Sequence, residues 1–229
     1  MESLLFKHAD EHSDVISALP RDTEAQGWTL ETIKSNPGRR FFKSHANLKQ
    51  IPVGTAKGLK VIYVARNPKD VSVSLYHHAL NKQKDSFVGD ESYMIGRFVQ
   101  GRCENGSWFD HVLEWWEAAN ADPEHVLFLH YEAMLSEPEA HIRKIAEFAG
   151  IEHTAETIAK TLSATSIDAM KRNPKANLRA SEHHIRKGGA GGWRDVYTVR
   201  ESELFDEIYL KAMGGTGLRM DFGEGLVMP

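Results

Sequence analysis

The sequence has a single cysteine, no long apolar run and no excess of basic residues. One cysteine, Cys103, excludes an internal disulfide and a thiolate zinc site. No stretch of about 18 apolar residues occurs, so we expect no membrane-spanning helix, and the first residues lack the apolar core of a secretory signal. Lys and Arg number 28 against 32 Asp and Glu, which argues against a general nucleic-acid-binding protein. These absences favour a cytoplasmic protein that has neither nucleic acid nor a membrane as partner.

The apolar pattern alternates between short runs and longer amphipathic stretches, which is typical of an α/β fold. The two runs at 60–65 and 126–130 are nearly continuous, as expected for strands of a parallel sheet that helices cover on both faces. A third, shorter strand is expected at 40–43. The helices that we expect begin at capping residues or at Pro68 and span 68 to about 78, 107–120, 136–150, 154–162 and 198–214. Segments 165–184 and 185–193 show no regular pattern.

Arg66 ends the second expected strand, directly before a helix that begins with Asn67, Pro68 and Asp70 in its first turn. An arginine at the carboxyl end of a buried strand is well placed to meet an anion, and free N–H groups at a helix start add partial positive charge. Ser74 lies two helical turns further on and can add a hydroxyl. The segment predicts an anion site; the alternative is a solvent-facing arginine that closes the loop.

A second basic segment leads into a glycine run at 188–192. Arg186 and Lys187 precede glycines whose bare backbone N–H groups can wrap an oxyanion, and arginine supplies a bidentate fork suited to phosphate. Phosphate binding is one interpretation of this segment. A flexible basic linker is the other, because glycine-rich loops are common.

His45 lies just past the first expected strand, after Lys43 and Ser44. A histidine in such a place can act as a general base near neutral pH, although any one of 12 histidines is more often structural or exposed. His8 and His12 are four residues apart but do not form the His-Glu-x-x-His pattern of a zinc site. We therefore expect no bound metal.

Taken together and in this order, these segments resemble the cytosolic sulfotransferase family, which uses 3′-phosphoadenosine 5′-phosphosulfate. The resemblance covers 39–222 of a single expected domain, 1–229, with 1–38 as a poorly defined lead-in. The matching segments are Lys43-Ser44-His45, 61–78, 106–112 with Trp115-Trp116, 130–134, 170–174 and 186–193. The resemblance implies a P-loop-like sulfotransferase fold, with a parallel sheet flanked by helices. It also implies sulfonate transfer to a hydroxyl of a small organic acceptor, without a metal.

The resemblance implies a role for each matched position. His45 is implied as the general base that takes the proton from the acceptor hydroxyl, and Lys43 as the neighbouring cation. The residues implied to hold the nucleotide are Arg66 and Ser74 on the 3′-phosphate, Arg186, Lys187 and Gly188 as its second clamp, Tyr131 on the adenine, and Thr165 and Ser166 beside the purine. The implied chemistry is an in-line displacement at sulfur, in which positioning and charge stabilisation dominate.

One motif of the family does not occur in this sequence. The family begins with a strand and a Pro-Lys-Ser-Gly-Thr-Thr-Trp loop that cradles the 5′-phosphosulfate, and neither this loop nor Gly-x-x-x-x-Gly-Lys-Ser/Thr is found here. We therefore expect a fold without that first strand and loop, and little turnover by these 229 residues alone. The alternative function is a truncated or non-catalytic relative that binds 3′-phosphoadenosine nucleotides or only dimerises.

Residues Arg194 to Glu203 resemble the short dimer motif of the family, Lys-x-x-x-Thr-Val-x-x-x-Glu, with arginine in place of the lysine. The resemblance implies a homodimer in which Arg194 of one chain pairs with Glu203 of the other, while Val199 is buried at a two-fold axis. The alternative is that Thr198 only caps the last helix and Glu203 is solvated.

Overall fold

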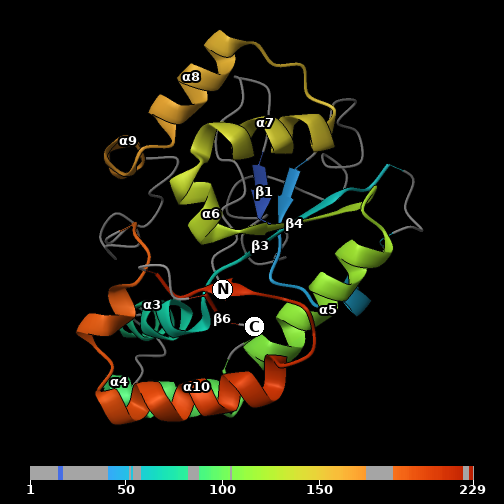
Figure 1. Ribbon diagram of the computed structural model, residues 1–229. Helices are drawn as coiled ribbons and strands as arrows, with labels where there is room; N and C mark the ends of the chain where they lie inside the picture. Colours follow the sequence, from blue (N-terminus) through green and yellow to red (C-terminus); the bar gives the residue numbers. More distant parts are fainter. Residues whose placement is uncertain are drawn as a thin grey trace.

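The computed structural model describes residues 15–17, 41–51, 53, 58–81, 88–103, 105–173, 188–223 and 227–228. The fold is α/β, as the apolar pattern predicts. In Figure 1, α6 (Tyr131–Ser136) and α7 (Pro138–Ala149) lie on one side of the paired strands β3 (Val61–Ala65) and β4 (Val126–His130). On the other side lie α3 (Pro68–Asn81), α4 (Glu91–Val99) and α10 (Val199–Met213). Helix α5 (Trp108–Ala121) leads into β4, and α8 (Ala155–Ala164) and α9 (Ile167–Arg172) follow α7.

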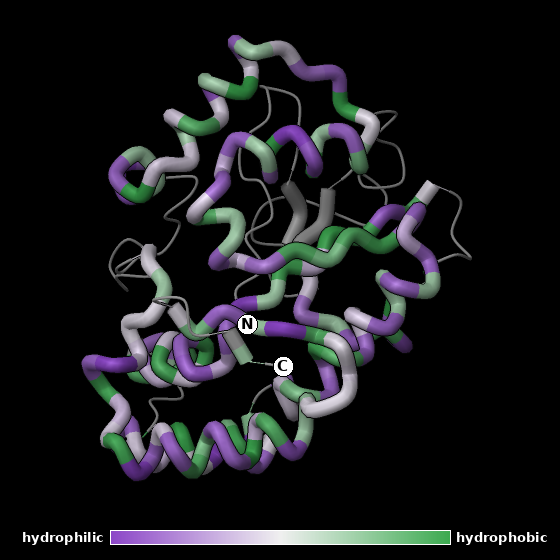
Figure 2. Tube along the Cα trace, viewed as in Figure 1, coloured by the Kyte–Doolittle hydropathy of each residue, from purple (hydrophilic) through white to green (hydrophobic). Residues whose placement is uncertain are grey.

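The strands β3 and β4 confirm the expected parallel sheet. They pair in parallel from Val61 opposite Val126 to Ala65 opposite His130, and Figure 2 shows them as a mainly hydrophobic path between the two helical layers. Two further pairs are described: β1 (Val15–Ser17) runs parallel to β2 (Phe41–Lys43), and β5 (Met220–Asp221) runs antiparallel to β6 (Val227–Met228). The parallel register of β3 and β4 brings their carboxyl ends to one edge.

Most of the expected helices form, but one helix start was predicted wrongly. Ser136 does not cap α7: it is the last residue of α6, and its hydroxyl donates back to the Ala133 carbonyl at 3.1 Å. Helix α7 begins instead at Pro138, because proline has no N–H to lose and its φ suits the first helical turn. The Thr198–Glu201 capping box at the start of α10 is confirmed, with a backbone N–H to carboxylate distance of 2.8 Å.

Three helices, α4, α6 and α9, were not predicted from the sequence. Helix α9 occupies part of a segment that has no regular apolar pattern, and its six residues are too few to show a helical period. None of the helices in the described part of the chain is long and apolar enough to cross a membrane.

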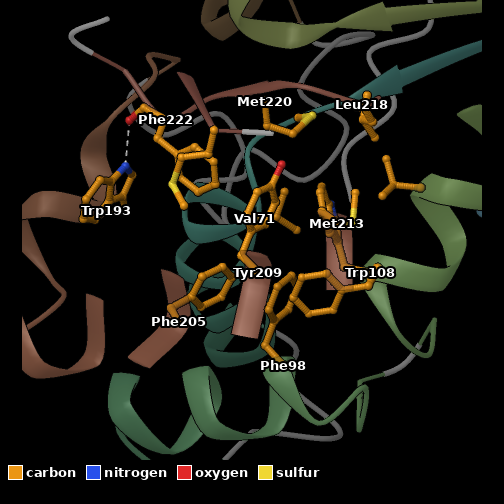
Figure 3. Packing of buried hydrophobic residues seen from close by; sticks show 14 of the residues in the cluster. Val71, Phe98, Trp108, Trp193, Phe205, Tyr209, Met213, Leu218, Met220 and Phe222 are labelled. Carbon is orange, nitrogen blue, oxygen red and sulfur yellow. Dashed lines mark hydrogen bonds between the residues drawn. The ribbon is translucent and has the colours of Figure 1, made fainter. Parts of the chain in front are cut away.

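The main core lies where α10 packs against α4, α5 and the segment that contains β5. Figure 3 shows Phe205, Tyr209 and Met213 of α10 facing Phe98 and Trp108, and all five are at most 4% exposed. Burial of each such side chain contributes about 1.5–3 kcal/mol relative to leaving it in water. This core fixes the position of α10 and of the segment that leads into it from the glycine run.

Candidate functional site

The guanidinium of Arg66 lies at the edge where β3 and β4 end. Its Cζ is 4.8 Å from the centroid of the Tyr131 ring, and one amino group donates to the Gly189 carbonyl at 2.9 Å. The parallel register explains the first contact, because Arg66 follows β3 and Tyr131 follows β4. Three segments that are far apart in the sequence therefore meet here: the strand end at 66, the strand end at 131 and the glycine run.

The glycine run is held against the start of α3 by Asp70. The backbone N–H of Gly191 donates to Oδ2 of Asp70 at 2.7 Å, and that of Trp193 donates to Oδ1 at 2.9 Å. The Asp70 side chain is 3% exposed and lies 3.7 Å from the nearest Arg66 nitrogen. The run is therefore an ordered part of the site.

Gly188 packs against α9 in a conformation that favours glycine. Its φ is +67°, and a Cβ at this position would collide with Cδ1 of Ile167. This contact brings the expected clamp residue next to Ser166, which caps α9 by accepting from the Ala169 N–H at 3.3 Å. Thr165 is exposed and donates its hydroxyl to the Thr161 carbonyl.

The other residues that we expected to bind the nucleotide lie on α3, at the start of α6 and outside the described residues. Ser74 lies on α3, half-buried, one helical turn beyond Asp70 and hence on the same face of that helix. Tyr131 is 7% exposed. Arg186 and Lys187 lie outside the described residues, so their expected role in the clamp stays a prediction.

A buried hydrogen-bond network joins the segments that follow β3 and β4. Oε1 of Glu132 accepts from the backbone N–H of Asn67 at 2.9 Å and from its side-chain amide at 3.1 Å. Burial raises the pKa of Glu132 above its ordinary range, although the bonds from Asn67 oppose that shift. No role for Glu132 was predicted from the sequence, in which Asn67 and Asp70 were expected only as residues of a helix start.

His45 lies in the segment that follows β2. Its carbonyl oxygen is 3.4 Å from Nε2 of His111 on α5, and Nδ1 of His111 is 3.0 Å from the Tyr63 hydroxyl. Burial lowers the pKa of His111 and raises that of Tyr63, so the imidazole is neutral and the phenol keeps its proton. The Tyr63 hydroxyl then donates to Nδ1, and Nε2–H donates to the His45 carbonyl. Lys43 is the last residue of β2, and its side chain lies outside the described part of the structure.

A cavity of about 140 Å³ opens beside this segment. Its lining includes Asn47, two residues after His45, and the buried ring of His111. A larger hollow of about 600 Å³ adjoins it along α5 and is lined by Asn47, Lys49 and Glu114, among others. Neither His111 nor Tyr63 was assigned a role from the sequence, because their contacts join segments that are far apart in the chain.

Among the described residues no cluster of His, Cys, Asp and Glu is arranged to hold a metal ion. The groups that the described part of the site presents are a guanidinium, hydroxyls, an imidazole and backbone N–H groups. These groups suit a phosphorylated ligand and a proton transfer.

A family model and several known relatives match most of this chain. The family model described as "Sulfotransferase domain" matches residues 7–217. Sulfotransferase 1B1 of Canis lupus familiaris is 36% identical over 200 residues, which are 83% of this chain and 67% of that protein. Sulfotransferase 1A1 of Mus musculus is 39% identical over 196 residues, which are 81% of this chain and 67% of that protein.

Solved structures agree with this assignment. Mouse sulfotransferase SULT7A1, solved in complex with PAP, matches with a TM-score of 0.72 at 33% identity, over 81% of this chain and 69% of its own. Retinol dehydratase in a complex with retinol and PAP matches with a TM-score of 0.73 at 27% identity, over 89% of this chain and 64% of its own. The chain belongs to the sulfotransferase family, as its motifs predict, and its function is sulfonate transfer.

Proposed function

We propose that this chain takes a sulfonate group from 3′-phosphoadenosine 5′-phosphosulfate and transfers it to the hydroxyl of a small organic acceptor. In this proposal Arg66 binds the 3′-phosphate and His45 is the general base. The observation that carries the proposal is the guanidinium of Arg66. Its Nε–H is buried and finds no hydrogen-bond partner within the described part of the chain.

The surroundings of Arg66 favour an anion as the missing partner. A buried donor without an acceptor costs about 1–3 kcal/mol, and a phosphate oxygen would remove that cost through a charge-assisted bond. The ring of Tyr131 and the carbonyl of Gly189 fix the plane of the guanidinium. Asp70 does not neutralise Arg66 fully, because the two charges are 3.7 Å apart and the carboxylate already accepts two backbone N–H bonds.

The nucleotide that fits is one with a 3′-phosphate. Two of the solved relatives were determined with PAP bound, which has the form of the donor after loss of its sulfonate. In this proposal the hydroxyl of Ser74 contacts the phosphate and the ring of Tyr131 contacts the adenine. Gly188, held against α9, continues towards Arg186 and Lys187, the expected second clamp.

The transfer itself needs one proton acceptor. The acceptor oxygen attacks sulfur on the side opposite the 5′-phosphate. A bond between the acceptor oxygen and sulfur forms as the bond between sulfur and the 5′-phosphate oxygen breaks, and adenosine 3′,5′-bisphosphate leaves. His45 takes the proton of the acceptor hydroxyl. The bond from His111 to the His45 carbonyl fixes the main chain there. In this proposal the acceptor approaches through the cavity that Asn47 and His111 line.

Calorimetry on the wild-type chain tests the nucleotide part of this proposal. Adenosine 3′,5′-bisphosphate should bind more tightly than adenosine 5′-phosphate, because only the former reaches Arg66. A charge-assisted contact is worth about 1.5–3 kcal/mol, which corresponds to roughly 10–150-fold in affinity. Equal binding of the two nucleotides would sink the proposal.

We also propose a homodimer through the segment 194–203, and, from the family resemblance, a cytoplasmic location. Val199 in the middle of this segment is 76% exposed, a large exposure for an apolar side chain. Arg194 is partly engaged within the chain, since it donates to the carbonyls of Phe222 and Gly223 at 3.1 and 2.9 Å. The contact therefore depends on Val199 more than on an Arg194–Glu203 pair.

Val199→Glu should dissociate this dimer, because the substitution buries a charge at the symmetry axis without a partner. The interface would be smaller than the standard of about 1,600 Å², so the wild type should dimerise with modest affinity. Sedimentation of both proteins over a concentration series measures this. A wild type that stays monomeric at high micromolar concentration contradicts the dimer, and a variant that dimerises equally well moves the interface elsewhere.

A further inference from the structure

We propose that Asp70 is the positioning residue of the 3′-phosphate site: its buried carboxylate holds the glycine run in the conformation that faces Arg66. This inference rests on the proposed nucleotide function. Asp70 does not itself bind the nucleotide in this proposal. It acts through the backbone N–H groups of Gly191 in the run and of Trp193 directly after it, and through the first turn of α3.

The carboxylate of Asp70 is almost fully engaged. Oδ1 accepts from the Trp193 N–H at 2.9 Å, and Oδ2 accepts from the Gly191 N–H at 2.7 Å and from the Asn67 amide at 2.9 Å. Bonds of this length to an ionised oxygen are among the stronger hydrogen bonds in proteins. Gly191, near the end of the glycine run, and Trp193, directly after it, are therefore both anchored to α3.

These bonds change the interpretation of the glycine run. The sequence suggests that its bare N–H groups wrap a phosphate, but the N–H groups of Gly191 and Trp193 are already bonded to an anion of the protein. The end of the run is therefore attached to Asp70, and in this proposal the ligand meets the first part of the run, which begins at Gly188. Gly191 makes this geometry possible, because its φ is +81° and a Cβ there would lie 2.8 Å from an Arg194 nitrogen.

Asn67 and Lys69, both close to Asp70 in sequence, support this arrangement. The backbone N–H of Asp70 donates to Oδ1 of Asn67 at 2.8 Å, and Asn67 is bonded in turn to Glu132 in α6, just beyond β4. The neighbouring Lys69 is fully buried, with its ammonium 2.6 Å from Asp206 and 4.2 Å from the centroid of the Trp193 ring. Lys69 therefore holds the ring of Trp193 while Asp70 holds its N–H.

The bonds that Asp70 makes to the glycine run also affect the orientation of Arg66, the residue expected to bind the 3′-phosphate. The Gly189 carbonyl, two residues before the anchored Gly191, accepts from Arg66. If the bonds from Asp70 are lost, the Gly189 carbonyl can move away, and the guanidinium of Arg66 loses the contact that orients it. Removal of the Asp70 charge also relieves its pull on Arg66, but at 3.7 Å that pull is weaker than the two direct bonds. The net result is a weaker site for the 3′-phosphate.

The test compares Asp70→Asn with the matched variant Asp90→Asn. Asp90 also has a carboxylate at a helix start that accepts a backbone N–H, from Tyr93 at 2.8 Å, but it is exposed and caps α4. Calorimetry gives the affinities for adenosine 3′,5′-bisphosphate and adenosine 5′-phosphate. Asp70→Asn should weaken the first by about tenfold and leave the second nearly unchanged, and Asp90→Asn should change neither.

Each outcome is decisive. Unchanged bisphosphate affinity in Asp70→Asn overturns the inference, and an equal loss for both nucleotides assigns Asp70 a general structural role instead. A wild type that does not distinguish the two nucleotides refutes the proposed function, which is a separate result. If Asp70→Asn does not fold, amide exchange on the wild type decides. The amides of Gly191 and Trp193 should then exchange about 100-fold more slowly than unprotected amides, and fast exchange contradicts the anchor.

Discussion

His45→Ala should lower the rate of sulfonate transfer by about 10²–10⁴-fold, the usual contribution of a general base. Without the imidazole, the acceptor hydroxyl has no group to take its proton as the S–O bond forms. The measurement is the transfer of radiolabelled sulfonate to a panel of phenols. It is made on a version of the chain extended upstream of Met1 by a Pro-Lys-Ser-Gly-Thr-Thr-Trp loop, because this sequence does not contain the loop that cradles the 5′-phosphosulfate in the family.

His141→Ala is the matched control for this prediction. His141 is half-buried on α7, where its Nδ1 lies 2.8 Å from the Glu137 carbonyl oxygen. It has no role in the proposed mechanism, so the variant should turn over at the wild-type rate. The affinity for adenosine 3′,5′-bisphosphate should stay the same in both variants, because His45 is expected to face the acceptor. Normal turnover by His45→Ala would remove the general base from the mechanism.

Arg66→Ala should weaken the binding of adenosine 3′,5′-bisphosphate by roughly 10–150-fold, the effect of losing a charge-assisted contact worth about 1.5–3 kcal/mol. The affinity for adenosine 5′-phosphate should change little, since that ligand has no 3′-phosphate. Calorimetric titration of the variant with both nucleotides measures the difference. It separates loss of one phosphate contact from general damage to the site.

Two further variants sharpen the Arg66 prediction. Arg66→Lys keeps the charge but loses the planar face against Tyr131 and the forked geometry, so its affinity should fall between those of the wild type and Arg66→Ala. Arg143→Ala removes an exposed arginine that pairs with Glu139 on α7 and should have no effect. If Arg66→Ala weakens both nucleotides equally, Arg66 shapes the site without binding the 3′-phosphate.

The two paired strands and the contact between Arg66 and Tyr131 were predictable because each has a local signal. The runs at 61–65 and 126–130 are apolar without interruption, which indicates buried parallel strands. The residues directly after two parallel strands must share an edge of the sheet, and Arg66 and Tyr131 do so. His45 was predicted from its place after a strand and from the family resemblance, and its role as a base remains to be tested.

The supporting network was not predictable, because its contacts cross long stretches of chain. The bonds of Asp70 reach the glycine run 121 and 123 residues further on, and Glu132 lies 65 residues from Asn67. Such pairs leave no periodic pattern in a single sequence. Local rules also misled at Ser136, where a hydroxyl three residues before a glutamate indicates a capping box, but Pro138 determines where α7 begins.

A crystal structure of the wild-type chain with adenosine 3′,5′-bisphosphate bound tests the central claim most directly. The account predicts that a 3′-phosphate oxygen lies about 3 Å from Nε of Arg66, within hydrogen-bond distance, with the run from Gly188 closed over the nucleotide and Gly191 still bonded to Asp70. A nucleotide bound elsewhere, or one whose 3′-phosphate faces solvent while Arg66 Nε stays without an acceptor, would contradict it.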